Sequence, residues 1–217
     1  MKTIPVKICG LTSAEDAKEA FSSGASFGGI ISHPESPRYV EPDRIPRILA
    51  EIPKGKRVWV AVEPSSEEVE SAFESGFDFA QIHFDPDSDY DPIKFSEKFG
   101  PERLWLAPRL SNPADFRPEW VGKATVILID GFSRDRMGGT GQRVEGKPFA
   151  ELMKRFPEQR FSIAGGISPL NVGEVLWASQ AKQIDVSSGI ESAPGIKEPQ
   201  KIRALFDAVK DFQNSER

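Results

Sequence analysis

Short apolar runs alternate with amphipathic segments along the whole chain. Each run is bounded by polar, glycine or proline residues. Runs this short that stay apolar throughout are typical of parallel strands covered on both faces. They predict strands at Val6–Cys9, Phe27–Ile31, Arg57–Val62, Phe79–His83, Leu104–Ala107, Thr125–Ile129, Phe161–Ala164 and Gln183–Val186.

Helical signals fall between these runs. Thr12-Ser13-Ala14-Glu15 has the form of a capping box, and Ser65-Ser66-Glu67-Glu68 begins another helix. Ser168-Pro169-Leu170-Asn171 places a proline near a helix start, and the last helix is predicted to run from Pro199 to Phe212. The polar stretch Asp85–Asp89 is typical of a loop. The chain is therefore a series of strand and helix units.

Repeated strand and helix units predict the α/β class. Eight of them within residues 1–217 fit a single-domain (β/α)8 TIM barrel, in which the catalytic groups lie at the carboxyl ends of the strands. An open, doubly wound parallel sheet is the alternative. No linker or low-complexity block divides the chain, so one domain with one large core is the simplest organisation.

The composition limits which partners the protein can bind and in which cellular compartment it is expected. The net charge is −5, with both signs spread along the chain, which argues against nucleic acid as a partner. No run approaches the roughly twenty apolar residues of a membrane span, and no signal peptide is apparent. A single cysteine excludes an internal disulfide framework. We therefore expect a soluble protein of the reducing cytoplasm, without a membrane partner.

Polar or small residues follow most of the predicted strands, and a barrel would gather them at one rim. They are Cys9, Arg38, Glu63, His83, Arg109, Asp130, Gly165, Gly166, Ser187 and Ser188. Such residues are common in any loop, and a lone free cysteine is more often a small buried apolar residue than a reactive one. By themselves these positions favour an active site only weakly.

Glycine clusters follow the last three predicted strands. They are Gly138-Gly139-Thr140-Gly141, Gly165-Gly166 and Ser187-Ser188-Gly189. Glycine lets backbone N–H groups approach an anion closely, and barrels of this class commonly bind phosphate in the loops after the last two strands. One cluster alone is more often an ordinary turn, but three at these places favour a phosphorylated substrate.

Several longer motifs occur in a fixed order over nearly the whole chain. The most specific is Asp185–Glu191 followed by Pro194–Lys197. The others are Lys7–Thr12, Ser36–Val40, Gln81–His83, Ile127–Asp130 with Gly138–Gly141, and Ala164–Ile167 with Asn171-Val172. Together they resemble the phosphoribosylanthranilate isomerase family, which performs an Amadori rearrangement in tryptophan biosynthesis.

This resemblance implies a role for each group. Cys9 would be the general base that takes the proton from C2 of the ribose, and Asp130 the general acid that protonates the ring oxygen as the furanose opens. The product would be 1-(2-carboxyphenylamino)-1-deoxyribulose 5-phosphate, formed without a metal or organic cofactor. Arg38 would contact the anthranilate end, and Gln81 and His83 would also bind substrate, although His83 could instead bond to a neighbouring loop. The implied phosphate-binding residues are Gly139, Gly141, Gly165, Gly166, Ser187, Ser188 and Gly189.

The two catalytic groups need opposite protonation states, because a thiolate accepts a proton and a neutral carboxylic acid donates one. Lys7 shares a strand face with Cys9, so we expect its ammonium to lower the thiol pKa from about 8.5. The alternative is an ion pair between Lys7 and Asp185 on the eighth strand. The apolar run before Asp130 predicts a raised pKa for its carboxyl, whereas a helix cap or a brace for a loop is the alternative role.

Some positions depart from the family pattern. Glu63 replaces a usual asparagine, Phe84 replaces a glycine, Gly28-Gly29-Ile30-Ile31 lacks the usual phenylalanines, and Val144-Glu145-Gly146 replaces Phe-Asp-Trp. These departures surround the aromatic end of the expected substrate, so two further functions stay open. One is an isomerase or epimerase of another phosphosugar, and the other is a non-catalytic phosphate-ligand binder. The oligomeric state is expected to be monomer or homodimer.

Overall fold

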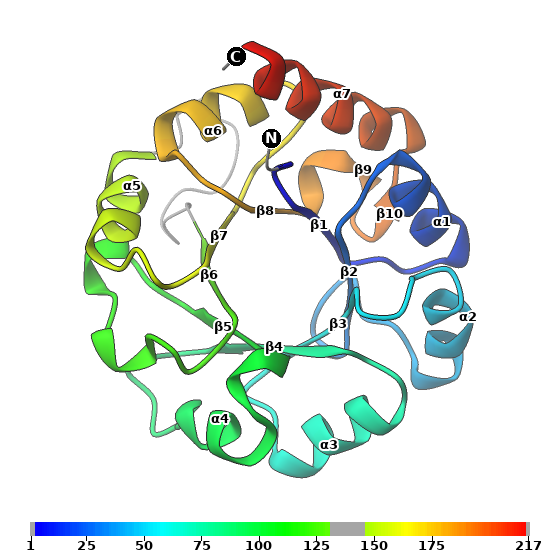
Figure 1. Ribbon diagram of the computed structural model, residues 1–217. Coiled ribbons are helices and arrows are strands. Elements are labelled where there is room, and N and C mark those ends of the chain that lie inside the picture. The colour runs from blue at the N-terminus through cyan, green and yellow to red at the C-terminus, as the bar shows by residue number, and fades with distance from the viewer. Residues whose placement is uncertain (1–2, 131–145, 216–217) are drawn as a thin grey trace.

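Eight parallel strands close into a barrel in chain order, and β8 pairs with β1 (Figure 1). The computed structural model describes residues 3–130 and 146–215. The predicted barrel is confirmed and the open sheet is excluded, since every predicted strand forms with its bounds kept or moved by one residue. The strands are β1 Val6–Cys9, β2 Phe27–Ile31, β3 Arg57–Val62, β4 Phe79–Phe84, β5 Leu104–Pro108, β6 Val126–Asp130, β7 Phe161–Ala164 and β8 Ile184–Val186.

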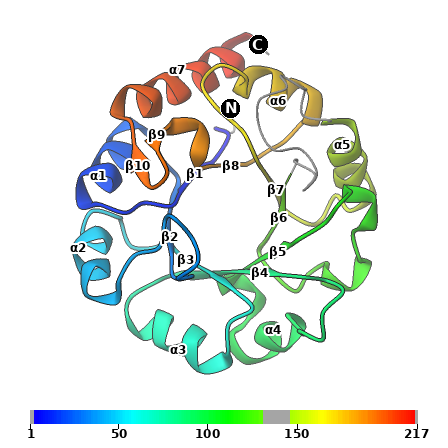
Figure 2. The ribbon, with the colours of Figure 1, turned by 180° about the vertical axis from the view of Figure 1, so that it is seen from behind.

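The helices form a ring outside the barrel, as the two opposite views show (Figures 1 and 2). Between β5 and β6 the chain makes two 3₁₀ turns, Pro113–Asp115 and Pro118–Trp120, instead of an α-helix. Each turn begins with a proline, which favours a short turn because proline lacks an N–H for a continuing helix. The helices are α1 Ala14–Ser23, α2 Ile45–Leu49, α3 Ser66–Glu74, α4 Ile93–Phe99, α5 Gly146–Arg155, α6 Val172–Ser179 and α7 Pro199–Ser215.

Local capping explains where these helices begin. Ser65 and Glu68 form the predicted capping box at the start of α3. The box predicted from Thr12 is wrong by one residue, because Ser13 is the N-cap of α1 and accepts a hydrogen bond from Asp16 N. Pro169 lies near the start of α6, as predicted, just before its first residue Val172, and α7 continues past the predicted end to Ser215.

The alternation of side chains along each strand divides the core into two layers. One face of every strand packs against the helices, and the other points into the barrel. The barrel interior contains Val58, Val60, Trp105 and Val126 together with Cys9. Phe27 closes this interior from β2, with its ring centroid 5.0 Å from that of Trp105. The site above this layer therefore rests on a packed apolar floor.

A short hairpin follows β8 and was not predicted from the sequence. It consists of β9 Glu191–Ala193 and β10 Ile196–Lys197, preceded by a 3₁₀ turn at Ser188–Ile190. In Figures 1 and 2 it lies between β1 and α1. The hairpin turn lies so close to the loop after β2 that an added Cβ at Gly195 would be 2.9 Å from Pro37 O. This contact holds the hairpin that follows β8 against the loop that follows β2.

Candidate active site

Cys9 ends β1 inside the barrel, with 7% of its surface exposed. Its partner across the sheet is Gly29 of β2. A Cβ added at Gly29 would lie 3.1 Å from Cys9 Sγ and 3.0 Å from Lys7 Nζ. The thiol and the ammonium therefore both lie against Gly29, and a larger residue there would require these side chains to shift by a few tenths of an ångström.

Lys7 lies below Cys9 on the same strand face and is fully buried. Its Nζ forms an ion pair with Asp185 Oδ2 of β8 at 2.9 Å and lies 5.9 Å from the ring centroid of Trp105. The interior ion pair considered from the sequence is thus confirmed. It places one cation and one carboxylate directly beneath the thiol.

The electrostatics of this group correct the expectation of a lowered thiol pKa. Burial raises the pKa of Cys9 more than the Lys7 ammonium lowers it, and the Asp185 carboxylate adds to the rise. Burial also disfavours the charge on Lys7, but attraction to Asp185 and Cys9 outweighs it and leaves the lysine pKa raised. The expectation was wrong because burial of the thiol outweighs the effect of the ammonium, whose carboxylate partner also opposes it.

We expect Lys7→Met to raise the pKa of Cys9 further, since the Asp185 carboxylate would then face the thiol without its cation. The measurement is the rate of iodoacetamide alkylation across neutral and alkaline pH. Lys7→Met/Asp185→Leu is the matched control, because it removes both charges and should return the midpoint toward that of wild type. An unchanged midpoint in Lys7→Met would contradict a role for the ammonium.

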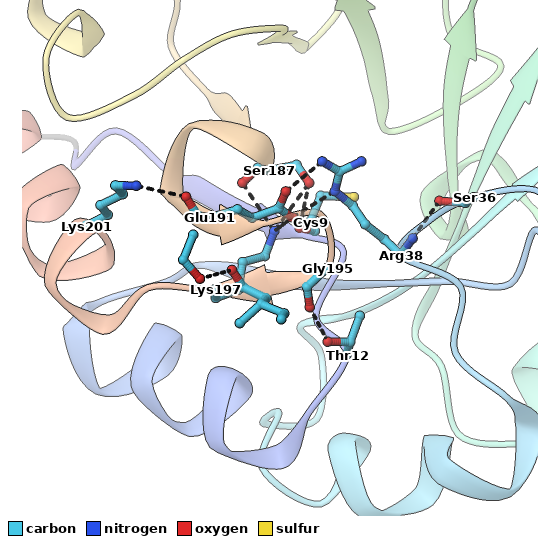
Figure 3. Close-up of polar contacts among 11 residues, drawn as sticks. Cys9, Thr12, Ser36, Arg38, Ser187, Glu191, Gly195, Lys197 and Lys201 are labelled. Atoms are coloured by element: carbon cyan, nitrogen blue, oxygen red, sulfur yellow. Dashed lines mark hydrogen bonds and ion pairs between the residues drawn. The ribbon is translucent and has the colours of Figure 1, made fainter.

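A charged network surrounds the mouth beside Cys9 (Figure 3). Arg38 donates from Nε and Nη2 to the two oxygens of Glu191, at 2.7 and 2.6 Å. Lys197 donates to Glu191 Oε1 at 2.8 Å and also reaches the backbone and side-chain oxygens of Ser187. Ser187 in turn donates from Oγ to Cys9 O at 3.0 Å. The loop after β2, the hairpin and the ends of β1 and β8 are thereby held together.

The same contacts fix the charge states of this network. Hydrogen bonding to Glu191 raises the pKa of Arg38. Burial would raise the pKa of Glu191, but its bonds from Arg38 and Lys197 lower it overall. Burial lowers the pKa of Lys197, although Glu191 opposes that shift. Two cations therefore share one carboxylate close to the Cys9 thiol.

Gln81 and His83 lie on the interior face of β4, where Gln81 Nε2 is 2.8 Å from His83 Nε2. In a neutral imidazole this nitrogen can pair with the Gln81 amide as acceptor or donor, according to the tautomer. Burial, with the nearby charges of Lys7 and Arg109, lowers the pKa of His83 to about 4. The imidazole is therefore neutral at physiological pH and offers a polar contact rather than a charge.

Two of the departures from the family pattern have structural explanations. Phe84 is 1% exposed and packs against Trp120, with ring centroids 5.4 Å apart, so it belongs to the helix-facing core. Glu63 has a left-handed backbone, φ 45°, which asparagine adopts more readily than glutamate. Its carboxylate accepts hydrogen bonds from Asp85 N at 2.9 Å and Ser88 Oγ at 3.2 Å. Glu63 thus braces the loop after β4.

The glycine loops after β7 and β8 meet at one place. A Cβ added at Gly189 would lie 2.0 Å from Ile167 O, so only glycine allows this approach. Gly165 and Gly166 both have left-handed backbones, with φ of 94° and 55°. Asn171 holds the first loop by donating to Gly166 O at 3.0 Å. Gly139, Gly141 and the other residues of the predicted loop after β6 lie outside the described residues, as do Val144 and Glu145.

Asp130 ends β6 at the same end of the barrel as Cys9, and it is in register with Ala164 of β7. Residues 126–129 are buried, but Asp130 itself is exposed. The burial expected from the apolar run before it is therefore not observed at Asp130, because this residue lies at the end of the strand.

The roles of Glu191 and Lys197 were missed from the sequence, although both belong to the most specific motif. The sequence did contain a signal for the hairpin: a glutamate and a lysine lie six residues apart, on either side of a proline-glycine turn. This spacing would place them on facing strands. Among residues 3–130 and 146–215 there is no cluster of three or more acidic, histidine or cysteine side chains that could hold a metal ion. No helix in that part of the chain has the length and apolar character needed to cross a membrane.

Comparisons with known proteins agree on one family. Residues 6–208 match the model of the family described as N-(5'phosphoribosyl)anthranilate (PRA) isomerase. The N-(5'-phosphoribosyl)anthranilate isomerase of Sulfurihydrogenibium sp. (strain YO3AOP1) is 33% identical over 210 residues, covering 95% of this chain and 98% of that protein. The crystal structure of phosphoribosyl anthranilate isomerase from Thermotoga maritima has a TM-score of 0.82 and 28% identity, covering 96% and 99% of the two chains. A structure of such an enzyme in complex with reduced 1-(o-carboxyphenylamino)-1-deoxyribulose 5-phosphate has a TM-score of 0.77, with 28% identity and the same coverage.

Proposed function

The chain belongs to the N-(5'-phosphoribosyl)anthranilate isomerase family, and from this premise we propose how its residues perform the Amadori rearrangement of phosphoribosylanthranilate in tryptophan biosynthesis. The observation that carries the proposal is the buried Cys9 thiol above Lys7, beside an Arg38 guanidinium at the barrel mouth. A base and a carboxylate-binding group thus lie together, as this substrate requires. The reaction is an aldose–ketose isomerisation, and no step needs a metal or organic cofactor.

In the first step Asp130 gives a proton to the ring oxygen of the ribose. The bond between C1 and this oxygen breaks, and the nitrogen lone pair forms a C1=N bond in an open-chain iminium ion. The exposed position of Asp130 lets it reach a substrate at the mouth. The bound substrate carries a phosphate and a carboxylate, and this negative charge favours the neutral, proton-donating form of the acid.

In the second step Cys9, as the thiolate, removes the proton from C2. The electrons of the C–H bond form a C1=C2 bond, and those of the iminium return to nitrogen, which gives an enolamine. Transfer of the enol proton from the oxygen to C1 then produces the ketose. The substrate gains the proton that Asp130 gives and loses the one that Cys9 takes, so the product is an isomer of the substrate. A proton then returns from the thiol to the carboxylate through solvent before the next turnover. Lys7 stabilises the thiolate from below.

Substrate binding divides between the two sides of the mouth. Arg38 receives the anthranilate carboxylate, since a guanidinium fork matches a carboxylate in two bonds. Gln81 and neutral His83 provide polar contacts from β4. The glycine loops receive the phosphate, through Gly139, Gly141, Gly165, Gly166, Ser188 and Gly189, with Ser187 holding the second loop to β1. Orientation by both ends would place C2 beside Cys9.

The proposed function also indicates the compartment, the binding partners and the oligomeric state of the enzyme. A single thiol with a catalytic role suits the reducing cytoplasm. The partner is the phosphosugar substrate, with neither nucleic acid nor membrane required. One solved relative, from Thermotoga maritima, is described as dimeric. For this chain a monomer or homodimer is proposed.

The test is a fluorescence assay with purified protein. Anthranilate and phosphoribosyl pyrophosphate, joined by a phosphoribosyltransferase, supply the labile substrate in place, and its fluorescence decays as the isomerase consumes it. We expect wild type to accelerate this decay. If folded wild type left the decay unchanged, the substrate assignment would be wrong, and isomerisation of other phosphosugars would be measured next.

A further inference from the structure

We propose that Glu191 is a positioning residue for recognition of the substrate carboxylate. It holds one edge of the Arg38 guanidinium, so that the adjacent edge is presented to the anthranilate end of the substrate. This inference rests on the proposed function. Glu191 belongs to the most specific motif of the sequence, but the two catalytic steps give it no role. The inference supplies that role.

The contact has the geometry of a two-point clamp. Nε and Nη2 of Arg38 donate to the two carboxylate oxygens of Glu191 at 2.7 and 2.6 Å. The Glu191 side chain is 4% exposed and that of Arg38 is 20% exposed. The carboxylate is therefore buried on the protein side, while part of the guanidinium still reaches the mouth.

The guanidinium retains enough donors for a second carboxylate. It carries five N–H groups, and the clamp uses one from Nε and one from Nη2. The remaining N–H of Nη2 and those of Nη1 form a second fork on the adjacent edge. An aromatic carboxylate at the mouth can thus bind in two bonds while Glu191 stays in place.

The aliphatic part of the Arg38 side chain packs closely on Gly10. It lies over Gly10, where an added Cβ would be 2.6 Å from Arg38 Cδ. Gly10 follows Cys9 directly and has a left-handed backbone, φ 70°. The arginine is therefore fixed beside the catalytic thiol by a glycine below it and a carboxylate at its side, so it loses little conformational freedom when substrate binds.

Charge also favours this arrangement. A clamp of one arginine and one glutamate would be neutral and would attract an anion weakly. Lys197, whose side chain is fully buried, donates to the same Glu191 carboxylate at 2.8 Å. Two cations and one anion leave the cluster with a net positive charge, which an anionic substrate group can neutralise.

A purely structural role for Glu191 is the competing explanation, because the residue also ties the hairpin to the barrel. The two roles differ in what they predict for ligands. A clamp that orients Arg38 affects only ligands with a carboxylate, whereas a loosened hairpin affects all ligands alike. Thr12→Val is the matched control, since Thr12 anchors the same hairpin at Gly195 O without touching Arg38.

The experiment measures binding of two probes by wild type, Glu191→Gln and Thr12→Val. One probe is reduced 1-(o-carboxyphenylamino)-1-deoxyribulose 5-phosphate, and the other is the same molecule without the carboxyl group. We expect Glu191→Gln to weaken binding of the first probe by about 10- to 100-fold, the range for charged hydrogen bonds, and to leave the second unchanged. In turnover, KM should rise by a similar factor with kcat nearly unchanged.

Three results would overturn the inference. They are equal losses for the two probes, an effect no larger than that of Thr12→Val, and a fall in kcat at constant KM. Glu191→Asp is the second variant if Glu191→Gln does not fold, because it keeps the charge of the cluster but shortens the reach to Arg38. It should show the same preference between probes in weaker form. Absence of turnover by wild type would instead overturn the proposed function, and this inference with it.

Discussion

Replacing Cys9 by alanine should lower kcat by about 10²- to 10⁴-fold, the range for loss of a general base, while the barrel stays folded. The thiol is the only group of β1 at the mouth that can take the C2 proton, and alanine offers no acceptor. Removal of one buried sulfur should destabilise the protein by only about 1 kcal/mol. The measurement is steady-state turnover in the coupled assay beside thermal unfolding.

Cys9→Ser is the matched variant, because it keeps the size of the side chain but replaces a thiol with an alcohol that does not ionise near neutral pH. It should be as inactive as Cys9→Ala. Both variants should bind the reduced product analogue as tightly as wild type, since neither changes Arg38 or the phosphate loops. Turnover within tenfold of wild type in either variant would exclude Cys9 as the base.

The dependence of thiol reactivity on pH follows from the same residue. Burial raises the pKa of Cys9 above its ordinary value of about 8.5. The proposed base is the thiolate, so the rate of iodoacetamide alkylation of wild type should increase as pH rises through neutrality and continue to increase into the alkaline range. Alkylation is measured instead of kcat/KM because turnover also needs the protonated form of Asp130, whose fraction falls as pH rises. His83 adds no step there, because its pKa lies at about 4. A rate that is flat from neutral to alkaline pH would contradict a thiolate base in the free enzyme.

Asp130→Asn should also lower kcat by about 10²- to 10⁴-fold, because the amide has no proton to give to the ring oxygen. The exposed side chain makes few demands on the fold, so the free energy of unfolding should change by no more than about 0.5 kcal/mol. Activity and stability are measured on the same preparation. A large loss of activity at constant stability is the signature of a group that acts on the reaction.

Asp89→Asn is the control for this variant. Asp89 is another exposed carboxylate, in the loop after β4, and its neutralisation changes the net charge by the same amount. We expect it to leave turnover close to that of wild type. Equal losses in the two variants would point to a general electrostatic effect, and comparable losses of activity and stability in Asp130→Asn would indicate a brace for a loop instead of an acid.

Much of the fold could be predicted because it depends on short-range patterns. Apolar runs such as Arg57–Val62 form strands with the predicted bounds, and Ser65 caps α3 as its neighbours required. Because side chains alternate along a strand, Lys7 and Cys9 could be predicted to share one face of β1. The positions of Cys9 and Asp130 at strand ends were also readable from the sequence. The shift of the first cap to Ser13 was not, since Thr12 is drawn to Gly195, far away in the chain.

The sequence by itself determined the strands, the order of the units and the chemical groups at the strand ends, because these depend on neighbouring residues. Only the tertiary structure decided how those groups behave. Closure of the barrel pairs Lys7 with Asp185 across 178 residues, and the hairpin clamps Arg38 with Glu191 across 153. The pKa of Cys9 rises instead of falling because burial and charge act through space, and they depend on which distant residues the closed barrel brings to the thiol.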